Sequence, residues 1–479
     1  MRQKVIIIGA GFAGLCMAIK LKEAGIHNFV VLEKGDQVGG TWYFNRYPGA
    51  ACDVPSCAYS YSFEPNPQWS RHFAAQPEIE AYIHHCVEKY QLADHVRCQQ
   101  AVTEAKWHDG SWVVSTAHGD EFEADFVVSA VGQLNAPSMP DIDGIDTFNG
   151  NSFHSARWPS DIDLSGKRVA VIGAAASAVQ LIPEVAKQAA HLRVFQRTPN
   201  YLIPRFDRPY LKVENWLFKH VPMVQKLYRW LVFNQGEWLF FPAMRRSKWA
   251  QRIMTWLANW QLKRQVSDLE LRELLTPRYE IGCKRVLMCD DYYPALMRPN
   301  VSLETAAITA VNADGVVTTQ GHFECDTIVY ATGFKATEFL QGFDVFGRDG
   351  LSLHEKWAGI TPAYRSVCIA GFPNFFTLYG PNSNLGSNSI IAMIEAQVGY
   401  VMQCVTAVER GEKRVVEVSA QAEATYQTWL VDSLAGTVWL QDCPSWYKNA
   451  EGGLNNNWPW SVRAFQRHMA VVDWADFSS

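Results

Sequence analysis

The chain has 479 residues and a mass of 54.1 kDa, which is enough for about three domains. Apolar residues make up 48% of it and charged residues 19%, so the composition excludes an intrinsically disordered protein. The net charge of −5 excludes the overall basic surplus that is typical of nucleic-acid-binding proteins.

The eleven cysteines are scattered and none forms a C-x-x-C motif, so we expect free thiols in the reducing environment of the cytoplasm. The apolar run at the N-terminus, Val5–Ile8, ends at a glycine and is too short for the core of a signal peptide. No stretch of about 18 uncharged apolar residues occurs, so no transmembrane helix is predicted. The sequence also predicts no metal site.

The chain opens with the order strand, glycine-rich turn, helix, strand, over Val5–Ile8, Leu15–Ala24 and Phe29–Leu32. Gly9 permits the tight turn, Gly11 lets a pyrophosphate approach the backbone, and Gly14 lets the helix pack closely on the strand. Glu33 ends the second strand, where its carboxylate can accept hydrogen bonds from ribose hydroxyls and repels a 2′-phosphate. This unit predicts a dinucleotide site of the kind that FAD occupies.

The same unit recurs over Arg168–Ile172, Val179–Ala190 and His191–Phe195. Its turn holds the candidate phosphate contacts Gly173, Ala175 and Ser177. Ala175 departs from the glycine motif and its Cβ points where a pyrophosphate approaches, so a repeat that binds no nucleotide is the alternative. Arg197 takes the position that Glu33 has in the first unit, and its guanidinium suits a 2′-phosphate. We therefore expect NADPH at the second unit.

Two similar segments frame the second unit: Asp125–Gly132 and Asp326–Gly333 are both apolar strands that end in small residues. We expect them to mark where the chain leaves and re-enters the first domain. The predicted fold is α/β, with two Rossmann-like dinucleotide-binding domains and an added helical segment. The FAD domain is split into residues 1–145 and 329–479, the second part including a C-terminal active-site loop. The NADPH domain spans residues 146–328, with the helical insert near residues 210–265.

The helical insert is dense in aromatic and aliphatic residues at helical spacing. Its predicted apolar face consists of Trp216, His220, Val224, Leu227 and Leu231. The pattern favours helices that pack over the second domain. A role at a membrane surface, as a peripheral contact, or in substrate access is the alternative.

A chain that binds FAD and NADPH passes electrons either to a cysteine pair or to dioxygen. Cys52 and Cys57 have the C-x4-C spacing of a redox-active disulfide and follow a Gly39-Gly40-Thr41 turn. Disulfide reductases place the first cysteine directly after that turn, where this chain has Trp42. An NADPH-dependent disulfide oxidoreductase that uses these two thiols is therefore the weaker alternative.

Two longer motifs resemble those of type I Baeyer–Villiger monooxygenases. Residues 148–159, F-N-G-N-S-F-H-S-A-R-W-P, are similar to the family fingerprint F-x-G-x-x-x-H-[ST]-x-x-W-[PD]. Residues 39–53 are similar to the second family signature, G-G-x-W-x-x-x-x-[YF]-P-G-x-x-x-D. With the two nucleotide units and the C-K-R, A-T-G-F and F-P-N segments, the resemblance extends over nearly the whole chain.

This resemblance implies an FAD- and NADPH-dependent monooxygenase that inserts one oxygen atom of dioxygen into a ketone. The product is an ester or a lactone, formed through a C4a-peroxyflavin. Relatives that oxidise nitrogen or sulfur lack the tryptophan of the fingerprint, and Trp158-Pro159 is intact here, which favours ketone chemistry. Heteroatom oxidation stays the alternative, and the sequence indicates neither the particular ketone nor the oligomeric state.

The resemblance also implies the roles of three charged residues. Arg285 matches the arginine beside the flavin that stabilises a peroxide anion, and Asp53 matches the carboxylate that positions this arginine. Lys284 matches a second contact to the NADPH 2′-phosphate, beside Arg197. General chemistry agrees, because a guanidinium stabilises an anion without giving up its proton.

The remaining site residues are implied less directly. His154 lies between the domains, where control of domain motion fits better than proton transfer. Trp446 matches an active-site tryptophan on the C-terminal loop, and Trp439 fits nearly as well. Further cofactor contacts are expected at Gly40, Thr41, Trp42, Thr332, Gly333 and Asn388. Asn388 precedes a helix whose N-terminus is expected to point toward the flavin.

Overall fold

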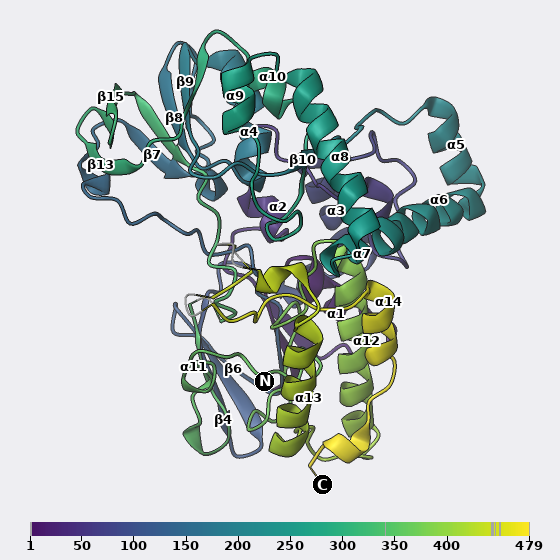
Figure 1. Ribbon diagram of the computed structural model, residues 1–479. Coiled ribbons are helices and arrows are strands. Elements are labelled where there is room, and N and C mark those ends of the chain that lie inside the picture. The colour runs from purple at the N-terminus through teal and green to yellow at the C-terminus, as the bar shows by residue number, and fades with distance from the viewer. Residues whose placement is uncertain (1, 341, 442–444, 446, 450–451, 479) are drawn as a thin grey trace.

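The computed structural model describes residues 2–340, 342–441, 445, 447–449 and 452–478. Figure 1 shows one sheet in the lower half of the molecule, a second at the upper left, and a group of helices projecting at the upper right. The lower sheet contains strands from both the N-terminal and the C-terminal parts of the chain, whereas the upper sheet comes from the middle.

The lower sheet has the strand order β17-β4-β5-β6-β1-β2-β3, and β18 pairs with β6. At its centre, β1 (Gln3–Ile8) pairs in parallel with β2 (Phe29–Leu32) and β6 (Glu121–Ser129). The run Val5–Ile8 is buried, as expected for a central parallel strand. The other strands are β3 (Val96–Arg97), β4 (Val102–His108), β5 (Ser111–Thr116), β17 (Asp344–Phe346) and β18 (Phe375–Thr377).

Helices cover this sheet. α1 (Phe12–Glu23) follows β1 and packs against α12 (Ile390–Glu409). α12 is long and apolar enough to cross a membrane, but 61% of its most apolar window is buried, as in the core helix of a folded domain. The other helices of this half are α2 (Thr41–Phe44), α3 (Gln76–Lys89), α11 (Leu353–Lys356), α13 (Ala420–Leu434) and α14 (Val462–His468).

The upper sheet has the order β12-β9-β8-β16-β7 and repeats the first unit. Its strands are β7 (Asn151–His154), β8 (Arg168–Ile172), β9 (His191–Phe195), β12 (Val301–Glu304) and β16 (Thr327–Tyr330), with α4 (Ala176–Gln188) after β8. Smaller elements lie around it: α9 (Leu269–Leu274), α10 (Tyr292–Leu296), the pair β10 (Leu202–Ile203) and β11 (Leu287–Met288), and the meander β13 (Ile308–Asn312), β14 (Gly315–Thr318) and β15 (Gly321–Glu324).

The two similar sequence segments occupy equivalent places in the two sheets. β6 lies beside β1, and β16 lies beside β8, in both cases as a parallel neighbour. After β6 the chain passes to the upper sheet, and after β16 it returns to the lower one. β16 crosses the predicted boundary at residue 328 and belongs to the upper sheet along its whole length.

Residues 212–265 are here called the helical wing; in Figure 1 its first two helices project at the upper right, and its last helix runs from the middle of the molecule up toward the upper sheet. It contains α5 (Lys212–His220), α6 (Pro222–Gln235), a π-helical turn (Gly236–Phe240), α7 (Phe241–Met244) and α8 (Lys248–Gln265). The predicted apolar face is not packed on the second domain: Trp216, His220, Leu227 and Leu231 are exposed and Val224 is half-buried. For α5 and α6 that expectation was wrong, because α6 packs on the N-terminal segment, where Gln225 and Arg229 bond to residues 57–66. α8 does pack against β10 and α10 of the second domain.

Candidate active site

A cavity of about 350 Å³ opens at the carboxyl ends of β1, β2 and β6, where the first glycine motif lies. Gly9 has a φ of +105°, and a Cβ there would lie 2.7 Å from the carbonyl oxygen of Ala130, so the turn requires glycine. A Cβ on Gly14 would lie 1.9 Å from the carbonyl oxygen of Gly9, so α1 packs on the turn only because Gly14 has no side chain. The cavity is also lined by Gly11, Glu33, Gly40, Thr41 and Trp42.

Glu33 is 4% exposed and is held in one orientation by the backbone around it. One carboxylate oxygen accepts a hydrogen bond from the Ala10 N–H at 2.7 Å, and the other accepts one from the Gly35 N–H at 2.8 Å. Each oxygen keeps a second lone pair, and the side chain lines the cavity. The carboxylate can therefore accept a ligand hydroxyl while it stabilises the glycine turn.

The second glycine turn has nearly the same backbone as the first. Gly173 has a φ of +119°, and a Cβ there would lie 2.4 Å from the carbonyl oxygen of Ala331. Ala175 takes the N-cap position of α4 with a φ of −91°, and Gly11 takes that of α1 with a φ of −84°. Because neither φ is positive, alanine adopts this conformation without strain. Ala175 is exposed and Ser177 is half-buried, so both are accessible to a ligand.

Arg197, which follows the carboxyl end of β9, and Lys284 lie near each other. Burial and the neighbouring charge of Arg197 lower the pKa of Lys284. Among the residues that the structure describes, neither cation forms an ion pair with a carboxylate, although the Lys284 ammonium lies 5.2 Å from the centre of the Tyr279 ring. Two neighbouring cations without a carboxylate partner are typical of a binding site for an anion such as a phosphate.

Arg285 and Asp53 form an ion pair between residues 232 positions apart in the sequence. The arginine Nη2 and Nε donate to the same carboxylate oxygen at 2.7 Å and 3.0 Å, and each side chain is 26% exposed. The charge of Asp53 raises the pKa of Arg285, so the guanidinium stays protonated. Tyr379 lines the cavity; burial raises the pKa of its hydroxyl and the positive charge of Arg285 opposes that shift, so the ion pair lies in the neighbourhood of Tyr379.

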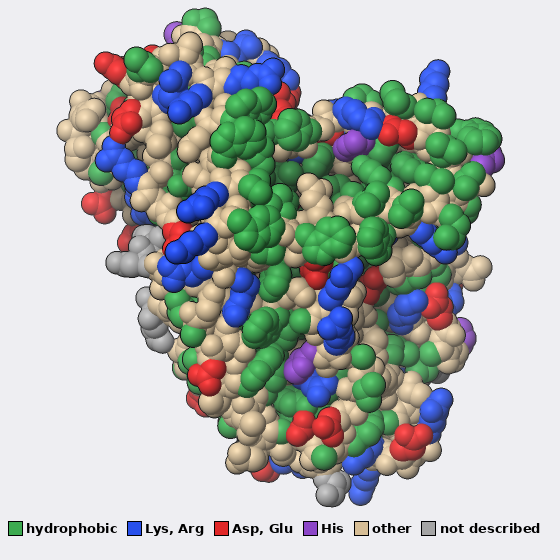
Figure 2. Space-filling view, turned by 45° about the vertical axis from the view of Figure 1, so that its right-hand side comes forward, with side chains coloured by type: hydrophobic (Ala, Val, Ile, Leu, Met, Phe, Trp, Pro, Cys, Tyr) green, Lys and Arg blue, Asp and Glu red, His purple; other side chains and the backbone are tan. Residues whose placement is uncertain are grey.

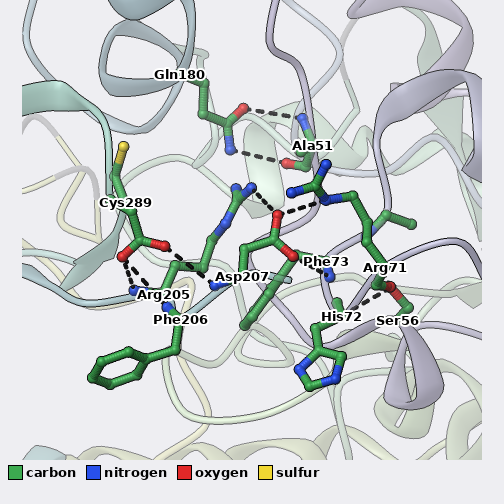
Figure 3. A network of polar contacts seen from close by, with 12 residues as sticks. Ala51, Ser56, Arg71, His72, Phe73, Gln180, Arg205, Phe206, Asp207 and Cys289 are labelled. Carbon is green, nitrogen blue, oxygen red and sulfur yellow. Dashed lines mark hydrogen bonds and ion pairs between the residues drawn. The ribbon is translucent and has the colours of Figure 1, made fainter. Parts of the chain in front are cut away.

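A network of polar contacts joins the N-terminal segment to the upper half of the molecule (Figure 3). The Gln180 side chain on α4 accepts a hydrogen bond from the Ala51 N–H at 3.3 Å and donates one to its carbonyl oxygen at 2.9 Å. Asp207 forms ion pairs with Arg71 at 2.7 Å and with Arg205 at 2.9 Å. The sequence motifs gave no signal for this network, because its members come from four separate segments.

The motif Tyr47-Pro48-Gly49 lies at the same contact. The Tyr47 hydroxyl donates to Gln180 Oε1 at 2.9 Å. Gly49 has a φ of +80°, and a Cβ there would lie 2.4 Å from the carbonyl oxygen of Gln180. The tyrosine and the glycine of the second signature therefore bring α4 against the loop that carries Asp53.

Comparison with known proteins decides the family. Residues 6–221 match the family model described as pyridine nucleotide-disulphide oxidoreductase. A protein of Pseudomonas aeruginosa named Baeyer-Villiger monooxygenase is 43% identical, over 97% of this chain and 89% of that protein. The chain belongs to the Baeyer–Villiger monooxygenases.

Solved structures of Baeyer–Villiger monooxygenases and their relatives have the same fold. An oxidized steroid monooxygenase bound to NADP matches with a TM-score of 0.87 and 32% identity, covering 98% of this chain and 96% of that one. A complex of OTEMO with FAD and NADP matches with a TM-score of 0.89 and 29% identity, covering 99% of both chains. The family and the two-domain α/β fold that the sequence predicts are confirmed.

In this Baeyer–Villiger monooxygenase, His154 ends β7 and is 4% exposed. Its Nδ1 accepts a hydrogen bond from the Ala156 N–H at 3.1 Å, and its ring packs edge to face on Phe334 at 5.7 Å. Burial lowers its pKa to about 4, so the imidazole is neutral at neutral pH. The contact joins the fingerprint to the segment where the chain returns to the lower sheet.

Several predicted contacts of this monooxygenase lie away from the cavity. The Thr332 hydroxyl donates to the carbonyl oxygen of Ser138 at 2.6 Å, and Gly333 has a φ of +88°. The Asn388 amide donates to the carbonyl oxygen of Phe233 in the helical wing at 2.9 Å. Ile390 and Ile394 on α12 do line the cavity, so the start of this helix faces it as expected.

The C-terminal loop is described only in part. Trp446 lies outside the described residues. Trp439 is 3% exposed, and its ring lies 5.8 Å from the Tyr447 ring. Tyr447 in turn lies near Arg285, and its charge contributes to the raised pKa of that arginine. Sequence reasoning missed Tyr59, which lines the cavity and hydrogen-bonds Trp42 at 3.1 Å, because no motif marks it.

The cysteine pair is unsuited to electron transfer. Cys52 and Cys57 are both free and buried. Burial raises the pKa of the Cys57 thiol to about 12 and raises that of Cys52 as well, so neither forms the thiolate that disulfide chemistry needs. Elsewhere, Cys283 is disulfide-bonded, so the expectation of free thiols throughout was wrong for this residue.

Proposed function

We propose that this chain is an FAD- and NADPH-dependent monooxygenase that inserts one oxygen atom of dioxygen into a small-molecule ketone, giving an ester or a lactone. The observation that carries this function is the Arg285–Asp53 ion pair in the neighbourhood of Tyr379, which lines the cavity that contains the first glycine motif. Family membership supports it, and a solved relative is a complex with FAD and NADP.

The residues of the cavity fit FAD. Gly9 and Gly11 leave the start of α1 without side-chain atoms, so N–H groups at the helix start can meet a pyrophosphate. Glu33 presents a carboxylate to ribose hydroxyls, and Trp42 and Tyr379 add aromatic walls. A flavin held by these residues would supply the redox chemistry, namely acceptance of a hydride from NADPH and activation of dioxygen.

The chain's own residues stabilise the charge that develops in the reaction. Oxygen transfer to a ketone requires an oxygen nucleophile that is anionic. Arg285 supplies a fixed positive charge, and because its pKa is raised it does not protonate that oxygen. Asp53 holds the guanidinium through Nε and Nη2, which leaves its remaining N–H groups available to another acceptor.

The second unit holds NADPH in this proposal. Arg197 and Lys284 bind the 2′-phosphate, and Gly173, Ala175 and Ser177 lie at the pyrophosphate. His154 acts as a positioning residue between the two halves, because a neutral buried imidazole is suited to packing more than to proton transfer. The proposed domains are residues 1–145 with 329–479 for FAD, and residues 146–328 for NADPH. Reduced thiols at nine cysteines support a cytoplasmic location.

Oxidation of nitrogen or sulfur is the competing reaction. Trp158 of the fingerprint packs edge to face on Phe153 of β7 at 5.1 Å. It is not among the residues that line the cavity, so its contribution is to the packing of β7. NADPH consumption should be measured over cyclic, aryl and long-chain ketones together with sulfides and amines, with the products identified. We expect esters or lactones from at least one class of ketone. Sulfoxides or N-oxides as the only products would overturn the proposal.

Replacement of both Cys52 and Cys57 by serine should leave flavin reduction by NADPH and oxygen transfer nearly unchanged. The reason is that both thiols are buried, protonated and unpaired with each other. Flavin bleaching by NADPH and product formation measure the two steps. Reduction of a disulfide substrate by the parent, lost in the double variant, would instead support the oxidoreductase alternative.

A further inference from the structure

α6 has apolar residues on its outer face as well as on its inner face, where Val224, Tyr228 and Phe233 pack against the core. Met223, Leu227, Trp230 and Leu231 follow the spacing of one helical face, and they are 69%, 58%, 47% and 50% exposed. The outer face of a surface helix in a soluble domain is normally polar. Packing within the domain therefore does not explain the apolar residues on the outer face of α6.

The inner face of α6 is held by polar contacts. The Gln225 amide donates to the carbonyl oxygen of Asn66 at 2.8 Å. The Arg229 guanidinium donates to the carbonyl oxygens of Cys57 at 2.8 Å and Ser60 at 3.0 Å. These directional bonds fix which side of the helix faces out, so the apolar face stays outward.

α8 carries a second apolar stripe of the same kind. Trp249, Ile253, Trp256 and Trp260 recur at helical spacing and are between 37% and 62% exposed. With Trp216, Trp230 and Trp238, the wing supplies six of the eight tryptophans that are exposed in the described chain. Figure 2 shows hydrophobic side chains over the lobe of α5 and α6, with blue cationic side chains beside them.

The charge of the wing is opposite to that of the whole protein. Residues 212–265 contain ten lysines and arginines but two acids, a net charge of +8 in a chain whose net charge is −5. Both acids have partners outside the wing: Glu214 forms an ion pair with Arg208 at 2.7 Å, and the buried Glu237 accepts a hydrogen bond from the Val462 N–H at 3.1 Å. The exposed cations are Lys212, Lys219, Lys226, Arg246, Lys248, Arg252, Lys263 and Arg264.

Cations and tryptophans also meet in a groove along α8. It has a volume of about 960 Å³, and its walls include Trp256, Trp260, Lys248, Arg252 and Lys263. Tryptophan is the residue that lies at the headgroup level of a bilayer, since its ring is apolar and its N–H seeks a polar partner. Lysine and arginine beside it are attracted to anionic lipid phosphates.

We propose that the helical wing is a peripheral membrane-binding surface for anionic lipid. The exposed apolar faces of α6 and α8 enter the headgroup region, and the cations of the wing bind lipid phosphates around them. A second copy of this chain fits less well, because two wings face to face would oppose charges of the same sign. The proposal does not depend on the reaction, and its test needs no substrate.

The test is sedimentation of the full-length holoenzyme with vesicles of phosphatidylcholine alone or mixed with phosphatidylglycerol. We expect binding to the anionic vesicles only, and a loss of binding at high salt. The double change Leu227→Gln with Trp256→Gln should lower the partition coefficient about tenfold or more, since both side chains are expected to enter the headgroup region. The charge reversal Lys226→Glu with Arg252→Glu should have a similar effect.

The matched control is Val431→Gln with Val471→Gln, two valines that are 55% and 69% exposed on the opposite half of the molecule. This variant should bind vesicles like the parent, and all variants should retain bound flavin as proof of folding. The absence of binding to anionic vesicles at low salt, or equal losses in the test and control variants, would overturn the proposal. So would a dimer in sedimentation velocity that the Leu227 and Trp256 changes dissociate.

Discussion

Replacement of Arg285 by alanine should lower the rate of ester formation by about 100- to 1000-fold, which is the typical cost of removing one preorganised charge partner. FAD should stay bound, because Gly9, Gly11 and Glu33 line the cavity and Arg285 does not. NADPH consumption that persists should yield hydrogen peroxide in place of ester. Product analysis beside rapid measurement of flavin absorbance would follow the two outcomes separately.

Arg278 provides a matched control for this experiment. Its side chain is 80% exposed and contacts Glu273, so Arg278→Ala removes the same charge from the same segment without changing the cavity. This variant should form ester at the parent rate. Ester formation at near-parent rates in Arg285→Ala would show that the anion is stabilised by another group.

Replacement of Arg197 by alanine should weaken NADPH binding by about 1.5–3 kcal/mol and leave NADH binding nearly unchanged, as expected when a charged hydrogen-bonding partner is lost. Replacement of the neighbouring Lys284 by alanine should also weaken NADPH binding more than NADH binding, since Lys284 lies beside Arg197. Dissociation constants for the two dinucleotides, measured on the oxidised enzyme, test the selectivity.

Arg193 on β9 serves as the control for the cofactor experiment. Its guanidinium lies 4.2 Å from the centre of the Phe323 ring, away from Lys284, so Arg193→Ala removes a cation from the same strand region. It should change the affinities for NADPH and NADH equally or not at all. Equal losses of both dinucleotides in Arg197→Ala would contradict the assignment of a 2′-phosphate contact.

The parts of the fold that sequence reasoning predicts are those set by local sterics. The turn requires a positive φ at Gly9 and at Gly173, and it leaves no room for a Cβ at Gly14. The glycine motif therefore predicts the turn. The alternation of strand and helix, repeated in two units, then determines the parallel strands at the centre of each sheet.

The parts that could not be predicted depend on contacts between distant segments. The ion pairs of Asp207 with Arg71 and Arg205 have no spacing that reveals them. The outward face of α6 is a different case, because helical periodicity shows which residues share a face but not which way that face points. The direction is set by Gln225 and Arg229, whose partners lie about 160 to 170 residues earlier in the chain.

The opposite charges of the helical wing and the remainder give the molecule an electric dipole. With +8 on the wing and an overall charge of −5, the rest of the chain carries −13, and the first two helices of the wing project to one side in Figure 1. A dipole turns in the field of a charged surface before any atom touches it, over a Debye length of about 8 Å at physiological ionic strength. The isoelectric point near 6.2 conceals this orientation, because it reports only the sum of the two charges.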